Sequence, residues 1–209
     1  MPKSEVFDKY WREYEDWFFR YDNLYKAELE VIKRLLPPFE NALEIGVGTG
    51  RFASALGIKV GIEPSTKMAS VAKERGVEVI DAVAEELPFE DESFDFVLMV
   101  TTICFVDDVK KSLSEIYRVL KRGGSVIVGF VDRETPLGKF YLQNRKNSRF
   151  YKEAIFFSAK EVEQLLKEAG FRECEALQTL FGDRLQDMKT IIKEGYGEGA
   201  FVVFRCKRV

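Results

Sequence analysis

The chain has 209 residues, with 35 acidic and 32 basic side chains, three cysteines and no histidine. This length suits one large domain or two small ones, and 46% apolar residues can bury a normal core, which excludes wholesale disorder. A net charge of -3 argues against a general nucleic-acid binder. The missing histidine excludes Ser-His-Asp and Cys-His nucleophile systems and His-ligated zinc or haem.

The cysteines are Cys104, Cys174 and Cys206, which lie far apart and form no C-x-x-C pair. We interpret them as small apolar residues in a reducing cytoplasm rather than as metal ligands or disulfide partners. The first residues lack the apolar segment of a signal peptide, and the longest apolar run, 96–106, is shorter than the ~20 residues that span a bilayer. We therefore expect a cytoplasmic protein without a membrane span. Charged residues reach 32%, which favours a thermophilic source.

Apolar and aromatic positions spaced three and four apart predict a helix over 4–36, which the double proline Pro37-Pro38 ends. Short apolar strands then alternate with helices as far as residue 131. Strands are expected at Ala42–Ile45, Lys59–Ile62, Val77–Ile80, Phe94–Val100 and Ser125–Val131. Helices are expected at Arg51–Leu56, from Ser65 to Arg75, and from Asp107 to about Lys121.

The segment 132–157 is predicted to be irregular and basic. After it, Ser158 and Glu161 form a capping box for a helix that ends at Gly170. Two last strands are expected at Phe171–Leu180 and Ala200–Lys207. Their connection is polar and dotted with glycines, and it contains no crossover helix, so we expect an antiparallel pair at one edge of the sheet.

Strands that alternate with helices predict a doubly wound α/β sheet with helices on both faces. The loop after the first strand contains Gly46, Gly48 and Gly50, so its backbone can turn tightly and approach a ligand closely. The helix that follows points unpaired N–H groups at that ligand. Glu63 ends the next strand, where an acidic residue can pair with ribose hydroxyls. Together these features predict a nucleoside-containing ligand rather than a purely structural turn.

Charge near the glycine loop distinguishes between possible nucleosides. The dinucleotide fingerprint needs a third glycine at position 51, which is Arg51, and no G-K-[ST] follows for a Walker-type loop. Glu44, two residues before the first glycine, would repel a pyrophosphate and attract an ammonium group. S-adenosylmethionine carries an ammonium group and no phosphate, so the arrangement favours this cofactor over NAD.

Several sequence motifs, found in the same order along the chain, indicate a protein family. They are Leu43–Gly50, Gly61–Ser65 with Met68, Ala84–Phe89, Ser93–Val97, Glu115–Gly124, and Phe157–Ser158 through Ala169–Phe171. The chain resembles the class I S-adenosylmethionine-dependent methyltransferases, in particular the type-11 group that includes ubiquinone/menaquinone-biosynthesis methyltransferases. The resemblance implies a seven-stranded sheet, mostly parallel, with an antiparallel C-terminal hairpin.

We expect a single domain over 1–209. Its predicted parts are an N-terminal helical cap (1–38), a cofactor-binding core (39–131), a substrate-side insertion or lid (132–157), and a C-terminal helix and hairpin (158–209).

The resemblance also implies roles toward S-adenosylmethionine. The loop glycines would line the methionine and ribose, Glu44 would hold the ammonium group, and Glu63 would accept both ribose hydroxyls. The expected cofactor residues are Glu44, Gly46, Val47, Gly48, Gly50, Glu63, Pro64, Ser65, Met68, Ala84, Glu85 and Thr101. Val83 stands where related proteins often carry an acid, which leaves the adenine amino group to Glu85 or to backbone carbonyls.

Methyl transfer from a sulfonium starts from an activated leaving group, so the protein mainly supplies alignment and water exclusion. We expect a small-molecule N, O or C acceptor between the cap and the segment after the fifth strand. The candidate contacts are Tyr10, Tyr14, Trp17, Arg133 and Tyr141. Each aromatic could instead simply pack the cap onto the domain. No general base is assigned, and Asp107 and Asp108 are interpreted as helix caps.

Other functions are also consistent with the residues. Segment 136–152 mixes basic and aromatic side chains and contains no acidic one, so it could recognise RNA, a protein or an acidic acceptor. The alternative is an ordinary solvated basic face. A non-catalytic S-adenosylmethionine-binding protein is a third possibility. We expect no metal, no covalent role for Cys104 and no nucleic-acid partner, and the sequence does not indicate an oligomeric state.

Overall fold

A mixed eight-stranded sheet forms the centre of the computed structural model, which describes residues 4–209. The strands are β1 (Ala42–Ile45), β2 (Val60–Ile62), β3 (Glu78–Ile80), β4 (Phe94–Val100), β5 (Leu120–Val131), β6 (Arg172–Thr179), β7 (Lys193–Glu194) and β8 (Phe201–Lys207). Their order is β3-β2-β1-β4-β5-β8-β6-β7, with β1 to β5 parallel and β8 antiparallel to both of its neighbours. The predicted doubly wound sheet and its antiparallel C-terminal strands are confirmed. The sheet has eight strands rather than seven because β7 pairs two residues of the polar connection with β6.

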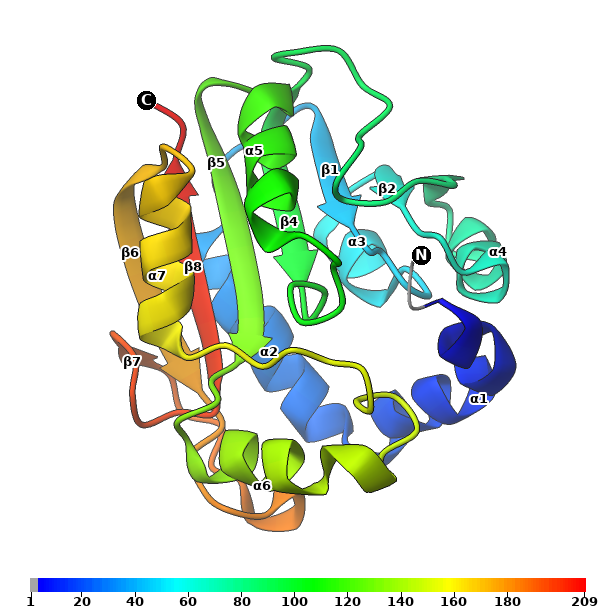
Figure 1. Cartoon of the computed structure of the whole chain (residues 1–209), viewed down its shortest axis with the longest axis vertical. Helices are drawn as coiled ribbons and strands as arrows, with labels where there is room; N and C mark the ends of the chain where they lie inside the picture. The colour runs from blue at the N-terminus through cyan, green and yellow to red at the C-terminus, as the bar shows by residue number, and fades with distance from the viewer. Residues whose placement is uncertain (1–3) are drawn as a thin grey trace.

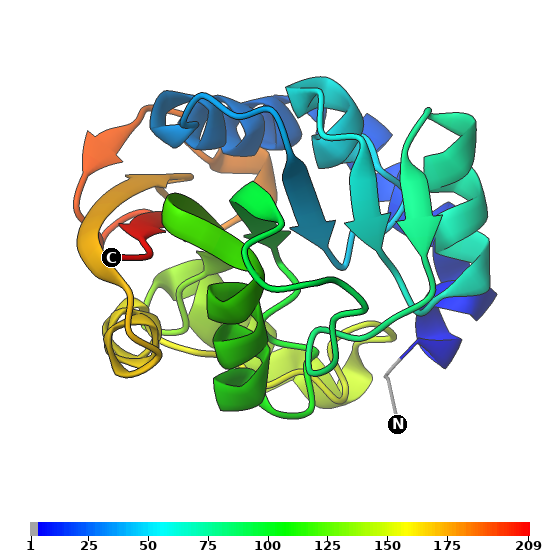
Figure 2. The same ribbon diagram turned by 90° about the horizontal axis from the view of Figure 1, so that it is seen from above.

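Helices cover both faces of the sheet. They are α1 (Glu5–Arg20), α2 (Asp22–Leu35), α3 (Arg51–Leu56), α4 (Thr66–Glu74), α5 (Val109–Val119), α6 (Pro136–Asn144) and α7 (Ala159–Glu168), with 3-10 turns η1 (Arg145–Asn147) and η2 (Leu185–Asp187). Figure 2 shows α2 and α3 on one side of the sheet and α5 and α7 on the other. Strand β4 serves both sides: Leu98 and Val100 join one core, while Val97 and Met99 join the other. Because β4 is buried on both faces, it is apolar from residue 96 to residue 100.

The helix predicted over 4–36 is interrupted at Tyr21, whose backbone angles of φ -120° and ψ 43° are not helical. The Tyr21 N–H donates to the Trp17 carbonyl and closes α1. As a result, α2 packs on the sheet while α1 turns away and packs along α4 (Figure 1). Residues 1–3 of the predicted cap lie outside the described residues.

The expectation of irregular structure over 132–157 is wrong for its first half, which contains α6. Thr135 caps this helix by accepting a hydrogen bond from the Gly138 N–H, and Pro136 occupies the first helical position. Proline suits that position because its missing N–H would have no helical partner there. Figure 1 places α6 beyond the arrowheads of β4 and β5, which are the carboxyl ends of these strands. Within residues 4–209, no helix combines the length and the apolar character needed to cross a membrane.

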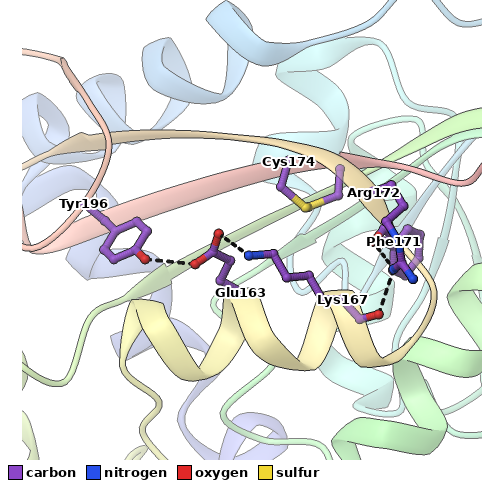
Figure 3. Close-up of a disulfide and its surroundings, with 7 residues drawn as sticks. Glu163, Lys167, Phe171, Arg172, Cys174 and Tyr196 are labelled. Carbon is purple, nitrogen blue, oxygen red and sulfur yellow. Dashed lines mark hydrogen bonds and ion pairs between the residues drawn. A yellow bond between two sulfur atoms is a disulfide. The ribbon is translucent and has the colours of Figure 1, made fainter.

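The interpretation of all three cysteines as small apolar residues is wrong for two of them, because Cys174 and Cys206 form a disulfide (Figure 3). Strands β6 and β8 pair Arg172 with Lys207 and Glu175 with Arg205, so two residues of β6 lie opposite one residue of β8. This β-bulge brings Cys174 opposite Cys206. Sequence spacing alone could not reveal a cross-strand pair that depends on a bulge.

We predict that the disulfide stabilises the edge of the sheet without contributing to ligand binding. It closes a loop with a sequence separation of 32. A loop of that size corresponds to about 2–4 kcal/mol of unfolding free energy. Urea denaturation with and without reductant measures the difference, and thiol titration of the denatured chain should find two more thiols after reduction. Equal thiol counts before and after reduction would contradict the prediction.

Candidate active site

The loop between β1 and α3 has no room for side chains at its glycines. Gly46 and Gly48 have φ angles of 64° and 56°, a conformation that favours glycine. A Cβ added at Gly46 would lie 2.5 Å from the Thr102 side chain, and one added at Gly48 would lie 3.3 Å from the Tyr14 hydroxyl. The backbone of this loop is therefore closely packed against Thr102 and Tyr14.

Glu63, at the end of β2, is tied to the glycine loop. Its carboxylate accepts hydrogen bonds from the Gly48 N–H and the Ser65 N–H, both at 2.9 Å. Burial, together with the nearby charges of Asp8 and Asp81, outweighs these two bonds and raises the pKa of Glu63 to about 7. The side chain thus sits between its protonated and charged forms near neutral pH.

Glu44 in β1 is a buried carboxylate with an unused oxygen. Its side chain is 2% exposed, and Oε2 has no hydrogen-bond partner among the described residues. Burial raises the pKa of Glu44 well above its ordinary value, a backbone hydrogen bond from Ala53 opposes this, and Glu63 adds to the rise. A buried polar atom without a partner is costly, which indicates that a cationic or hydrogen-bonding ligand group belongs nearby.

A cavity of about 460 Å³ opens at the carboxyl ends of β1, β2 and β4. We call it the cofactor cavity. Its wall contains eight of the predicted cofactor residues: Gly46, Gly48, Glu63, Pro64, Met68, Ala84, Glu85 and Thr101. A ligand at this edge of the sheet lies at the switch point of the doubly wound fold, between the paired strands β1 and β4, after which the chain continues to β2 on one side and to β5 on the other.

The other four predicted cofactor residues do not line this cavity. Val47 packs against Gly61, Gly50 begins α3, and Ser65 caps α4 by accepting from the Met68 N–H. Glu44 lies in β1, two residues before Gly46, and accepts a backbone hydrogen bond from Ala53. None of these four residues is a wall residue of the cofactor cavity.

The far end of the cofactor cavity is closed by the segment after β3. Glu85 accepts hydrogen bonds from the N–H groups of Asp107 and Asp108, which joins this segment to the loop after β4. Asp108 also caps α5 by accepting from the Lys111 N–H, as predicted. Val83 lines the cavity with an apolar side chain, so the acidic contact found in related proteins is absent at that position.

The cap is held over the site by Glu15 of α1. Its carboxylate accepts from Arg51 at 2.7 Å, from Arg75 at 2.6 Å and from the Thr49 hydroxyl. Burial tends to raise the pKa of Glu15, but the hydrogen bonds from these three side chains outweigh it and lower the pKa to about 2. Asp8, one turn from the start of α1, accepts from the Ser65 hydroxyl and the Lys67 N–H.

A second cavity, of about 480 Å³, lies between the cap and the α6 region. We call it the acceptor cavity. It shares four wall residues with the cofactor cavity: Phe7, Tyr14, Thr101 and Phe105. We call these four residues the shared wall. The two cavities are therefore adjacent and meet at these four residues.

Thr101 of the shared wall has a strained backbone. Its φ angle is 49°, which is rare for a β-branched residue, and its N–H donates to the Gly129 carbonyl at 2.7 Å. Strain of this kind costs roughly 1–3 kcal/mol and concentrates at functional sites. Tyr14 contributes a hydroxyl whose pKa is raised by burial first and by Glu63 and Glu44 next, so it stays protonated.

Three of the five predicted substrate residues line the acceptor cavity: Tyr14, Trp17 and Tyr141. The other two do not. Tyr10 packs against Phe150, and Arg133 is ion-paired with Glu161 and Glu134. The aromatic side chains of segment 136–152 line the cavity, whereas its five basic side chains do not.

Glu28 in α2 is a wall residue of the acceptor cavity that the sequence reasoning missed. It is 6% exposed and makes no hydrogen bond or ion pair within residues 4–209. Burial alone raises its pKa to about 8. A signal was present, because Leu24, Ala27 and Val31 share its helical face and form an apolar stripe that Glu28 interrupts.

Comparisons with known proteins agree with this geometry. A family model described as "Methyltransferase domain" matches residues 43–128. A crystal structure from Thermotoga maritima has 51% sequence identity and a TM-score of 0.94, and the match covers 99% of each chain. That protein is described as a SAM-dependent methyltransferase, possible histamine N-methyltransferase. The chain belongs to the S-adenosylmethionine-dependent methyltransferases.

Two further relatives are similar to this chain. An uncharacterized protein of Methanocaldococcus jannaschii is 48% identical over 204 residues, which is 98% of this chain and 99% of the relative. A ubiquinone/menaquinone biosynthesis C-methyltransferase of Stenotrophomonas maltophilia is 29% identical over 66% of this chain and 68% of its own length. The predicted resemblance to this methyltransferase group is confirmed.

The residues present fit S-adenosylmethionine, which is the cofactor of this methyltransferase. The unpartnered Glu44 oxygen beside the glycine loop suits an ammonium group, and Glu63 offers a carboxylate to hydroxyl donors. Within residues 4–209, no cluster of acidic or cysteine side chains is arranged to hold a metal ion.

We predict that Glu63→Gln weakens binding of S-adenosylhomocysteine about 10- to 100-fold, because hydrogen bonds to a charged group contribute about 1.5–3 kcal/mol. Wild-type affinity should also fall as the pH drops below about 7, since protonation removes the carboxylate that accepts the hydroxyls. Calorimetric titration between pH 6 and 8 measures both effects. The exposed Glu78→Gln variant is the control, and equal affinities for all three proteins would refute the role of Glu63.

We predict that Glu28→Gln stabilises the ligand-free protein at high pH. Glu28 has an ordinary pKa near 4.5 when unfolded but about 8 when folded, so wild-type stability is lost as the pH rises between these values. At pH 8 the variant should gain about 4 kcal/mol over wild type, and the gain should fall below about 0.5 kcal/mol near pH 4.5. Denaturant unfolding measures this difference. The exposed Glu30→Gln variant should show no such pH dependence, and a destabilised Glu28→Gln protein at pH 8 would contradict the prediction.

Proposed function

We propose that the protein transfers a methyl group from S-adenosylmethionine to a small molecule bound in the acceptor cavity. The observation that carries this proposal is the shared wall, because two cavities of small-molecule size meet at its four residues. Ligand pockets for small molecules commonly have volumes of about 300–1,000 Å³. The second cavity is therefore large enough for an acceptor beside the cofactor.

The proposed cofactor contacts follow the arrangement of charges. Glu63 would accept the ribose hydroxyls, Glu44 would compensate the ammonium group, and the loop at Gly46 and Gly48 would lie against the methionine part. Pro64 and Met68 would border the adenine. The cofactor supplies a methyl group on a positively charged sulfur when it is bound.

The side chains of this protein would contribute position and water exclusion. Phe7, Tyr14 and Phe105 enclose the junction between the cavities with aromatic rings, and Phe7 packs edge-on against Phe105 at 5.1 Å between centroids. Holding two reactants in line can lower a barrier by several kcal/mol without any acid or base. This requirement suits a chain that contains no histidine.

The acceptor cavity argues against an RNA or protein acceptor. Lys139, Arg145, Lys146, Arg149 and Lys152 of segment 136–152 do not line it, and Arg149 is paired with Glu13. Nucleic-acid sites present basic side chains to phosphates. A wall of aromatic rings favours a small organic molecule instead, and residues 132–157 would act as the substrate-side lid.

A cytoplasmic location and a thermophilic source stay predictions, and intracellular disulfides are a known feature of hyperthermophile proteins.

A labelled-methyl transfer assay tests the proposed function. The panel contains amines, phenols, quinols, transfer RNA and protein, and we expect transfer to small molecules only. Methylation restricted to RNA or protein would contradict the proposal, and so would binding of the cofactor with no transfer to any acceptor.

Tyr141→Ala tests the acceptor cavity itself. Removing this ring should raise KM for the acceptor about tenfold, because a buried aromatic contact contributes about 1 kcal/mol or more. The affinity for S-adenosylmethionine should stay within about twofold, since Tyr141 lines only the acceptor cavity. Tyr196→Ala, at an exposed tyrosine bonded to Glu163 far from the cavity, is the matched control. An unchanged KM for the acceptor in Tyr141→Ala would place the acceptor elsewhere.

A further inference from the structure

The charges that line the acceptor cavity are all acidic. Its wall contains two carboxylates, Glu13 and Glu28, and no lysine or arginine among the described residues. Glu13 is half-exposed and ion-paired with Arg149. Glu28 is buried and has neither an ion pair nor a hydrogen bond within residues 4–209. The cavity therefore contains one uncompensated carboxyl group.

Aromatic rings line the same cavity as this carboxyl group. Tyr141 and Tyr151 pack with their ring centroids 5.1 Å apart, and Tyr14 and Phe18 pack edge-on at 5.2 Å. All four rings line the same cavity. The faces of aromatic rings attract organic cations, most strongly where water is excluded. The wall thus combines a lone acid with rings that favour positive charge.

We propose that the acceptor cavity binds a protonated organic amine, with the Glu28 carboxylate as its counter-charge and aromatic rings as its walls. An ammonium nitrogen has no free electron pair, so methyl transfer to that nitrogen would follow return of one proton from the amine to the Glu28 carboxylate. This inference rests on the proposed function and names the class of acceptor that it would take. An amine that also carries a phosphate or carboxylate is disfavoured, because no basic side chain in the wall could balance the extra negative charge.

The neutral alternatives explain Glu28 less well. A phenol or quinol needs no carboxylate for binding, and an apolar residue at position 28 would complete the stripe of Leu24, Ala27 and Val31. A carboxyl group without a protein partner lowers stability, and a ligand group that compensates it would explain its presence in the wall. A cation supplies both the charge and the hydrogen bonds that Glu28 lacks.

Binding of a cation should displace a proton from Glu28. Burial raises the pKa of Glu28 to about 8, so most of the empty protein carries a neutral carboxyl at pH 7. The other titratable groups in the wall are Glu13, which is paired with Arg149, and the tyrosines Tyr14, Tyr21, Tyr141 and Tyr151. Burial raises the pKa of Tyr14, Tyr141 and Tyr151 further above neutrality. Glu28 is therefore the group expected to release the proton.

Calorimetric titration of the complex with S-adenosylhomocysteine tests the proposal. The probes are amines and their alcohol counterparts, such as 2-phenylethylamine with 2-phenylethanol and 1,4-diaminobutane with 1,4-butanediol. We expect at least one amine to bind at least tenfold more tightly than its alcohol. Titration at pH 7 in buffers of different ionisation enthalpy should show release of roughly 0.9 proton per amine bound. Glu28→Gln should abolish both the preference and the proton release, whereas Glu30→Gln should keep them.

The possible outcomes distinguish a failure of the amine assignment from a failure of the proposed methyltransferase function. Normal S-adenosylhomocysteine binding and methyl transfer to a phenol or quinol, with Glu28→Gln unchanged, would overturn the amine assignment alone. Failure of every amine to bind, or equal affinities for amines and alcohols, would also overturn it. Absence of any small-molecule methyl transfer would refute the proposed function itself. A variant that keeps its S-adenosylhomocysteine affinity is shown to be folded, so lost amine binding then reports on Glu28 directly.

Discussion

The ion-paired cluster around Glu15 is the interaction on which the site depends. It joins α1 to the glycine loop through Thr49 and Arg51 and to α4 through Arg75. Breaking a buried ion pair of this kind typically costs about 3–5 kcal/mol, because the remaining charges lose their partners. The adjacent residue, Tyr14, belongs to the shared wall. Attachment of the cap and formation of both cavities are therefore consequences of the same contact.

The buried carboxyl groups of Glu15, Glu63 and Glu28 differ in pKa because their surroundings differ. Glu15 has two guanidinium partners and keeps its charge with a pKa of about 2. Glu63 receives two backbone N–H groups, and its pKa is about 7. Glu28 receives nothing within residues 4–209, and its pKa is about 8. The first stabilises the fold, whereas the other two lower stability and provide acceptor groups that ligands can use.

The fold and the cofactor loop could be predicted because their signals are local. Strand periodicity, the glycines at 46, 48 and 50, and the acid at Glu63 each depend on a few neighbouring residues. The Cys174–Cys206 disulfide could not be predicted, since a bulge in β6 sets that pairing. The acceptor cavity joins α1, α2 and α6, which are far apart in sequence. Two local signals were nevertheless present. Thr135-Pro136 is a typical start of a helix and indicates α6, and Glu28 interrupts an apolar helical stripe, which indicates a buried carboxyl group.

The most direct test is a crystal structure with S-adenosylhomocysteine and a bound amine. The central claim is that the shared wall brings the reacting centres of two adjacent ligands together. We predict that the sulfur lies beside Tyr14 and Thr101, facing the acceptor cavity, with the amine nitrogen within hydrogen-bond distance of Glu28. A sulfur that faces away from the shared wall, or a second ligand outside the aromatic cavity, would contradict the claim.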